Sequence, residues 1–193
     1  TFVGYSEGLP ASGSTVCSSG KYARKHAPWV NFNNVPASSN QPFSSFPSDF
    51  TKLPKVSFVI PNLCNDMHDC PVVNGDSWLK ANLDAYAQWA KTNNSLLIVT
   101  TDEDDGSSGN QIATVFYGAH VTPGIRTESI NHYSVLATLE TMFGLPVLGS
   151  GSTITDVWST SPTLGTTVVS DNSQLCMAVK ASSSSALAPI VQS

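Results

Sequence analysis

The stretch Ser95-Leu-Leu-Ile-Val-Thr-Thr-Asp-Glu-Asp-Asp-Gly106 determines how the rest of the chain is interpreted. Its first part, Leu96 to Thr101, has the length and the β-branched content of a strand that is buried on both faces, as in a parallel sheet. Four carboxylates follow at once, from Asp102 to Asp105. Ligands of open α/β sheets bind outside the carboxyl ends of the strands. The pattern therefore predicts an acidic run at a ligand-binding edge of a sheet.

The acidic run (Asp102–Asp105) has two interpretations. Closely packed carboxylates repel one another, and a hard cation relieves this repulsion because it prefers oxygen ligands. The alternative is a solvated acidic turn. An EF-hand calcium loop is excluded, because placing Gly106 at its turn position puts Thr101 first and Ile112 twelfth, where Asp and Glu are required.

The composition restricts the class of protein. The 193 residues suffice for one domain with a substantial core, and only 12% of them are charged, as is common in secreted proteins. A formal net charge of −5 and a single short basic cluster argue against a nucleic-acid partner. No apolar run approaches the ~18 residues of a transmembrane span. Because the chain begins at Thr1 and not at an initiator methionine, we expect that a preceding segment has been removed.

The four cysteines are interpreted as two disulfides, which have three possible connectivities. Cys64 and Cys70 are close enough to close a small loop, which leaves Cys17 to pair with Cys176. A zinc site is the alternative, but the chain has no Cys-x-x-Cys spacing. Disulfides indicate an oxidising compartment, so we expect a secreted or extracytoplasmic protein.

We expect a single domain with three parts. Residues 1–55 are rich in proline, serine and aromatic side chains, which indicates an ordered, loop-rich covering segment. Residues 56–160 form the α/β core that carries the chemistry. Residues 161–193 are rich in serine and threonine and are interpreted as a tail, with a short edge strand over 167–170.

The core begins with a predicted strand–helix–strand unit. The first strand covers Lys55–Ile60 and is stopped by a proline. A helix follows, with Asp76 or Ser77 as its N-cap and one apolar face at helical spacing. The second strand is Leu96–Thr101. This unit predicts a three-layer α/β sandwich with a mainly parallel sheet.

Two further elements are expected after the acidic run. Residues 111–118 are typical of a strand. A second amphipathic helix begins near His132 and ends before Gly144. A helix N-terminus attracts anions such as phosphate, and a histidine there tends to stay neutral and able to bind metal. A histidine that caps or packs the helix is the alternative.

Polar side chains therefore gather at three places, each beside a regular element. Histidines next to carboxylates can act as general acids or metal ligands, and such mixed ligands suit phosphoester chemistry assisted by a divalent metal. For the first place, the alternative is an exposed loop whose Asx residues make turns. The three places are the loop cluster (Asn65, Asp66, His68, Asp69), the acidic run and the helix-start pair (Asn131, His132).

Several segments, in the right order, resemble the phosphoesterase family, which groups acid phosphatases with bacterial phospholipases C in the alkaline phosphatase superfamily. Secreted bacterial acid phosphatases are the most similar group that we recognise. The resemblance implies an alkaline-phosphatase-like fold. The segments are Tyr5–Pro10, Tyr22–Pro28, Ser57–Asp69, Gly75–Leu79, Leu96–Asp105, His132–Glu140 and Phe143–Pro146.

The resemblance also implies roles for individual residues. Asp102 and Glu103 would bind a divalent metal ion of unknown identity, and we assign Asp66 to the same ligand set. His68 would lie near the transferred phosphoryl group as ligand or general acid. His132 would complete the phosphate or metal environment, and we place Asp69 with these two histidines in the catalytic set.

The chain departs from the family pattern in one respect. Family members carry a preceding half with a Glu-Asn metal-binding pair and a serine or threonine nucleophile, and neither is present in this sequence. We therefore expect a sheet that lacks its N-terminal portion, with the other half supplied in cis or in trans.

The predicted function is metal-dependent hydrolysis of phosphate monoesters, including phosphoinositides or phospholipids. The alternatives are a phosphodiesterase of the phospholipase C type, and a secreted fragment that binds a cation or phosphate without turnover.

Overall fold

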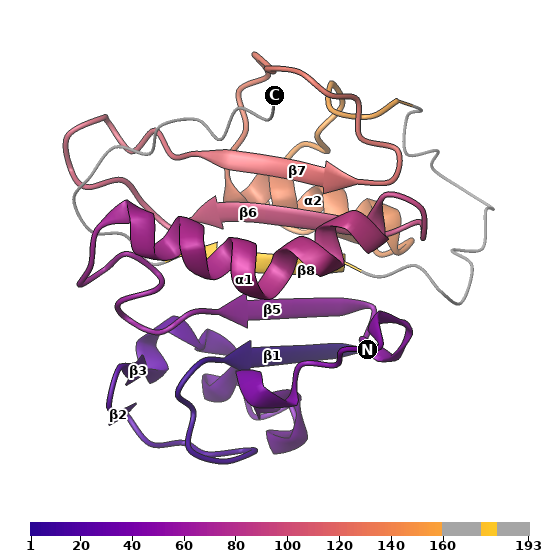
Figure 1. Ribbon diagram of the computed structural model, residues 1–193. Coiled ribbons are helices and arrows are strands. Elements are labelled where there is room, and N and C mark those ends of the chain that lie inside the picture. The colour runs from indigo at the N-terminus through magenta and orange to yellow at the C-terminus, as the bar shows by residue number, and fades with distance from the viewer. Residues whose placement is uncertain (160–174, 181–193) are drawn as a thin grey trace.

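The computed structural model describes residues 1–159 and 175–180, and within these residues six strands form one sheet in the order β4-β1-β5-β8-β6-β7 (Figure 1). Neighbouring strands from β4 to β6 pair in parallel, and β7 pairs antiparallel with β6. The predicted mainly parallel sheet is confirmed. The strands are β1 (Phe2–Ser6), β4 (Asn40–Pro42), β5 (Val56–Ile60), β6 (Leu96–Thr101), β7 (Thr114–Gly118) and β8 (Leu175–Lys180).

Two helices cover the opposite faces of this sheet (Figure 1). They are α1 (Val72–Ala90) and α2 (His132–Met142). Because side chains alternate along β6, this strand contributes to two cores. Leu97 packs with Tyr86 of α1 in one core, and Ile98 packs with Val135 of α2 in the other. The three-layer arrangement and the doubly buried strand are both as predicted.

The N-terminal segment does more than cover the core. Its short helical turns and packed aromatic rings fit the predicted ordered layer, but β1 and β4 also enter the sheet, which sequence patterns did not indicate. β1 is only five residues long and contains Gly4, so it shows no clear alternation. Outside the sheet lie the hairpin β2 (Ser18–Ser19) and β3 (Tyr22–Ala23) and the 3-10 helices Arg24–His26, Pro28–Asn31, Ala37–Ser39, Phe43–Ser45 and Phe50–Lys52.

Two element boundaries differ from the predictions. α1 begins at Val72 with the extended Pro71 as its N-cap, and not with the predicted Asp76 or Ser77. Gly75 therefore lies inside the helix, where an added Cβ would come 2.6 Å from Met67. This close approach, and not a helix start, explains the glycine. The strand predicted over 111–118 forms only at its second half, as β7.

The prediction of a C-terminal tail is wrong for β8, because this segment forms a strand of the sheet. This strand lies between β5 and β6 and pairs in parallel with both. Sequence order gave no hint of this position, because β5 and β6 are joined directly through α1. The predicted edge strand at 167–170 lies outside the described residues.

One of the two predicted disulfides is confirmed. Cys64 and Cys70 are bonded and close the loop after β5. Cys17 is free and exposed, so the pairing with Cys176 is wrong. The two cysteines belong to different regions: Cys17 precedes the surface hairpin, whereas the backbone of Cys176 pairs with Ser57 and Leu97 in the middle of the sheet. Among the described helices, none is long and apolar enough to cross a membrane.

Candidate functional site

The parallel strands β1, β5 and β6 end at the same edge of the sheet, and each is followed by polar residues. Glu7, directly after β1, connects two of these strand ends. Its carboxylate accepts hydrogen bonds from the backbone N–H of Asn62 (2.9 Å) and from the side-chain amide of Asn65 (3.0 Å). Sequence analysis missed Glu7 because it missed β1, whose carboxyl end places the residue here.

The loop between β5 and α1 is held rigidly. The Asn62 side chain accepts the backbone N–H groups of Cys64 and Asn65, which makes an Asx turn. The disulfide closes the same loop, and Met67, with a φ of 70°, packs against Gly75 of α1. The backbone that carries the loop cluster is therefore fixed. The Asx turn, which was predicted as the alternative to a functional role, does not exclude such a role.

Asp66 is the most buried member of the loop cluster, with 1% of its surface exposed. Its Oδ1 accepts the backbone N–H of His68 at 2.8 Å. Its Oδ2 lies 3.1 Å from Nδ1 of His26, an ion-pair distance, but the atoms are not aligned for a hydrogen bond, and within the described chain this oxygen has no hydrogen-bond partner. A buried carboxylate oxygen needs a positive partner, which a protonated His26 or a bound cation supplies.

His26 was also missed as a site residue. It belongs to Tyr22–Pro28, one of the segments that carry the family resemblance, but that resemblance gave it no role. The 3-10 helix Arg24–His26 brings its ring within 6.0 Å of the His68 ring, measured between centroids. Two histidines therefore lie side by side, each next to its own carboxylate.

His68 and Asp69 form the more exposed half of this arrangement. Nδ1 of His68 lies 2.8 Å from Oδ1 of Asp69, and Nζ of Lys21 lies 2.9 Å from Oδ2 of the same carboxylate. The hydrogen bond from His68, and then that from Lys21, hold the pKa of Asp69 below its ordinary value. The ionised carboxylate favours a proton on Nδ1 of His68 and orients the ring.

An NMR titration of the folded chain tests this geometry. We expect the pKa of Asp69 to lie below the ordinary aspartate value of 3.8 and to rise toward it in Lys21→Ala. Because the folded pKa is lowered, the stability that this carboxylate contributes is present above the ordinary value and is lost as the pH falls through the folded pKa. Lys52→Ala is the control, since Lys52 lies 3.6 Å from Asp49 instead. An unchanged Asp69 pKa in Lys21→Ala would contradict the described ion pair.

The helix-start pair is joined to the acidic run. Asn131 caps α2 by accepting the backbone N–H of Ser134, and the Ser134 hydroxyl accepts the backbone N–H of Asn131. Nε2 of His132 donates to the backbone carbonyl of Asp102 at 2.8 Å. In the neutral ring this leaves Nδ1 as the acceptor or metal-binding nitrogen. Sequence analysis predicted the helix start but not this contact.

The acidic run divides into two pairs with different surroundings. Asp104 accepts the backbone N–H groups of Gly106, Ser108 and Asn110, which lower its pKa, and Asp105 accepts from Ser107. These two carboxylates therefore shape their own loop. Asp102 and Glu103 are exposed at the end of β6, where Oδ1 of Asp102 accepts the backbone N–H of Glu103 at 3.0 Å.

In the chain as described, no group of three or more His, Cys, Asp and Glu side chains is placed to hold a metal ion. Asp102 and Glu103 are adjacent at the strand end, and Asp66 offers a buried oxygen without a hydrogen bond. These groups are suitable metal ligands by chemistry, but they do not make a complete shell. The predicted metal site stays a prediction.

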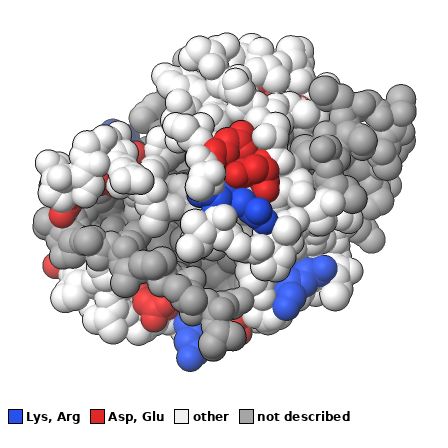
Figure 2. All heavy atoms as spheres, turned by 90° about the horizontal axis from the view of Figure 1, so that it is seen from above, with Lys and Arg blue, Asp and Glu red and all other residues white. Residues whose placement is uncertain are grey.

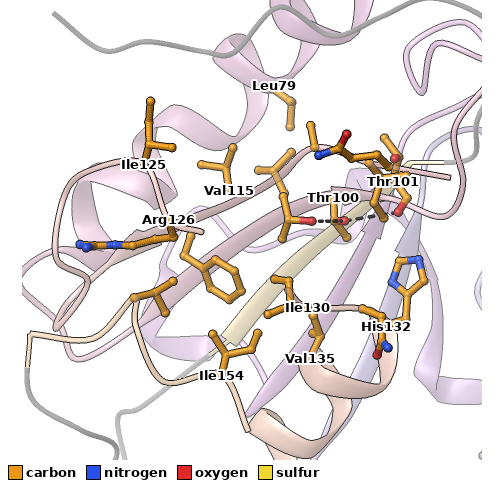
Figure 3. A pocket seen from close by; sticks show the side chains of 18 of the residues that line it. Leu79, Thr100, Thr101, Val115, Ile125, Arg126, Ile130, His132, Val135 and Ile154 are labelled. Carbon is orange, nitrogen blue, oxygen red and sulfur yellow. Dashed lines mark hydrogen bonds between the residues drawn. The ribbon is translucent and has the colours of Figure 1, made fainter. Parts of the chain in front are cut away.

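A cavity of about 990 Å³ is lined by members of two of the predicted places, whereas His68, Asp69 and the carboxylates of the acidic run are not among its lining residues. Thr101 at the end of β6 and His132 lie at one end of the cavity (Figure 3), and its lining also includes two members of the loop cluster, Asn65 and Asp66. Three strand or helix ends thus contribute polar groups to a single concave site. This convergence is what binding and chemistry on a small polar group require.

Comparisons with known proteins agree with this arrangement. A family model described as "Phosphoesterase family" matches residues 1–146. The chain belongs to the phosphoesterase family. The predicted membership is thereby confirmed, together with an α/β fold of the kind that the family implies.

Relatives in this family are named as phosphatases. A phosphatidylinositol-3-phosphatase of Mycobacterium tuberculosis is 63% identical over 163 residues, which cover 82% of this chain and 54% of the relative. An acid phosphatase of Aspergillus fumigatus is 32% identical over 66% of this chain and 32% of the relative. One of Aspergillus niger is 31% identical over 75% and 39%. The chain thus spans about half or less of these relatives. A comparison with solved structures found no match.

Proposed function

We propose that this phosphoesterase-family chain hydrolyses phosphate monoesters. The observation that carries the proposal is the meeting of part of the loop cluster (Asn65 and Asp66), Thr101 at the end of β6 and the helix-start pair in the lining of a single cavity. The names of the relatives supply the reaction class.

In this proposal, His68 transfers a proton at the phosphate ester. Asp69 orients the His68 ring, and its lowered pKa keeps it ionised in mildly acidic solution. His132, at the N-terminus of α2, faces the phosphate together with the positive end of the helix. Asp66 supports the loop through its hydrogen bond to the backbone of His68.

We further propose that Asp102, Glu103 and Asp66 contribute to a divalent-metal site. A bound metal would neutralise charge on the phosphate. Since these residues do not form a complete shell, the remaining ligands and the nucleophile would come from a preceding half, in cis or in trans. The lengths of the relatives support this, because the matched regions cover at most 54% of those described above.

The finer substrate proposal is a phosphoinositide, supported by the 63% identity to a protein named phosphatidylinositol-3-phosphatase. We also propose secretion, which the Cys64–Cys70 disulfide supports.

Turnover of p-nitrophenyl phosphate, from pH 4 to 8 with divalent metal or chelator, tests the reaction in the chain joined to a preceding half as long as that of the relatives. We expect chelator-sensitive turnover that falls at least about a hundredfold in Asp102→Asn. Asp105→Asn is the matched control, since Asp105 binds Ser107 within its own loop. Phosphate binding without turnover, both alone and when joined to a preceding half as long as that of the relatives, would indicate a non-catalytic binding protein.

A further inference from the structure

The two edges of the sheet differ in how they end. β4 has three residues and finishes at Pro42, which has no backbone N–H, and the carbonyl of Asn40 accepts the backbone N–H of Gly13 at 2.7 Å. β7, the outermost strand on the other side, has five residues and contains neither proline nor a charged side chain (Figure 1). Proline, charge and a covering segment are common means of preventing further strand pairing. The β4 edge is therefore closed, whereas the composition of β7 allows a further strand.

The pairing of β7 with β6 shows which backbone groups of β7 face outward. The N–H of Ala119 donates to the carbonyl of Ser95 at 3.0 Å, so it points toward β6. This direction alternates along an antiparallel pair, which turns the N–H of Tyr117 toward β6 and that of Phe116 away from it. In the part of the chain that the structure describes, β7 pairs with β6 alone, and no segment outside the sheet makes a backbone hydrogen bond to Phe116. Phe116 therefore offers a donor and an acceptor to a further strand.

Both faces of the sheet are incompletely covered beside β7. No residue of β7 is fully buried, whereas five of the six residues of β6 are. The cavity lining includes apolar side chains on both faces: Val115 on the α1 face, opposite Val99, and Val135 and Ile154 on the α2 face (Figure 3). Strands of a sheet with helices on both faces are normally buried on both. This incomplete burial indicates that the sheet continues beyond β7.

We propose that the outer edge of β7 pairs with a strand of the preceding half of the protein. This inference rests on the proposed function and specifies where that half attaches. The relatives are long enough to supply such a strand, because the matched regions cover at most 54% of those described above. Seen from the β7 side of the sheet, most of the described surface carries no charged side chain (Figure 2), so an uncharged strand meets little there that would oppose its burial.

Pairing at this edge would also bring the preceding half to the candidate site. β7 runs antiparallel to β6, and Thr114 lies beside Thr100 near the carboxyl end of β6. A strand that is antiparallel to β7 is parallel to β6 and ends at the same edge of the sheet, where ligands of such sheets bind. A second copy fits less well. In a two-fold symmetric antiparallel pair of β7 strands, the β6 of the second copy ends at the opposite edge and adds nothing to this site.

Amide hydrogen exchange, measured by NMR, tests the proposal in this chain and in the chain joined to a preceding half as long as that of the relatives. The amide of Tyr117, which points toward β6, should be protected in both proteins and serves as the internal reference. The amide of Phe116 should exchange rapidly in the chain alone. In the joined protein it should exchange at least about a hundredfold more slowly, because the new pairing must open before exchange occurs.

Val115→Lys in the joined protein should remove most of the protection of Phe116. Val115 is 37% exposed in this chain, and a lysine at an edge strand opposes further pairing because its charge would be buried beneath the added strand. Val147→Lys is the matched control and should leave the protection unchanged, since Val147 is 47% exposed, lies after α2 and is not part of the cavity lining. If Val115→Lys fails to fold, the exchange of Phe116 in the unsubstituted joined protein still decides the question.

Rapid exchange of Phe116 in the joined protein would overturn the proposal. So would protection of Phe116 in this chain alone: protection that persists on dilution would assign the edge to this chain itself, and protection that dilution removes would assign it to a second copy. Turnover of p-nitrophenyl phosphate by the same joined protein keeps the two proposals apart. Protection without turnover removes only the proposed function, and turnover with rapid exchange of Phe116 removes only the pairing at β7.

Discussion

Replacing His68 with asparagine is expected to lower kcat/KM for p-nitrophenyl phosphate by about 10²- to 10⁴-fold, the usual contribution of a positioned general acid. Asp69 directs the proton of the ring to Nδ1, so the imidazole is oriented for proton transfer through its other nitrogen. Asparagine keeps a polar side chain of similar reach but cannot transfer a proton near neutral pH. The free energy of unfolding should change by less than about 1 kcal/mol, because His68 is partly exposed.

His120→Asn is the matched control for this experiment. His120 is exposed, belongs to none of the three predicted places and has a φ of 63°, a conformation that asparagine tolerates better than most residues. Its kcat/KM should stay within about twofold of the unmodified chain. If His68→Asn also stays within that range at every pH from 4 to 8, His68 is not the general acid.

The central part of the fold was predictable because its signals are local. Leu96–Thr101 was predicted with its observed bounds, and the helical face that includes Tyr86 was recognised from its spacing. A short buried strand and an amphipathic helix can each be recognised from the residue pattern of a short segment. Since parallel strands end at the same edge, the loop cluster and the end of β6 could also be expected to lie near each other.

What sequence reasoning missed depends on contacts between distant residues. Glu7 reaches the loop cluster only because β1 pairs with β5, and His26 only because a 3-10 helix places it beside Asp66. The same holds for β8, which pairs with β5 and β6 although it comes from beyond the residues that the family model matches. No period or spacing within these segments specifies such partners.

For the acidic run, the residue types indicate more metal ligands than the geometry supports. The acidic run suggested four oxygen ligands, but backbone N–H groups already bind Asp104, and Ser107 binds Asp105. Hydrogen bonds within the turn thus compete with metal binding for these carboxylates. Asp and Asn side chains commonly make such hydrogen bonds to nearby backbone groups. Asp102 takes part in the same competition, since its Oδ1 accepts the backbone N–H of Glu103.

Tyr86→Ala is expected to lower the free energy of unfolding by about 3–5 kcal/mol, as for other large buried aromatic residues. Tyr86 is fully buried between α1 and the sheet, and its ring packs 5.4 Å from that of Phe50, measured between centroids. Its hydroxyl donates to the carbonyl of Leu96 at 3.2 Å. The substitution leaves a cavity and also removes this hydrogen bond. Urea unfolding followed by tryptophan fluorescence measures the effect.

Tyr86→Phe separates the two contributions, because it removes the hydrogen bond and keeps the ring. We expect it to cost about 0.5–1.5 kcal/mol, so most of the loss in Tyr86→Ala comes from packing. For a domain whose total stability is about 5–15 kcal/mol, the alanine variant loses a large share of it. The loop after β5 rests on α1 through Met67 and Gly75, so weaker docking of α1 should also loosen the frame that holds Asp66. Equal costs for the two variants would mean that the hydrogen bond to Leu96, and not the ring, attaches α1 to the sheet.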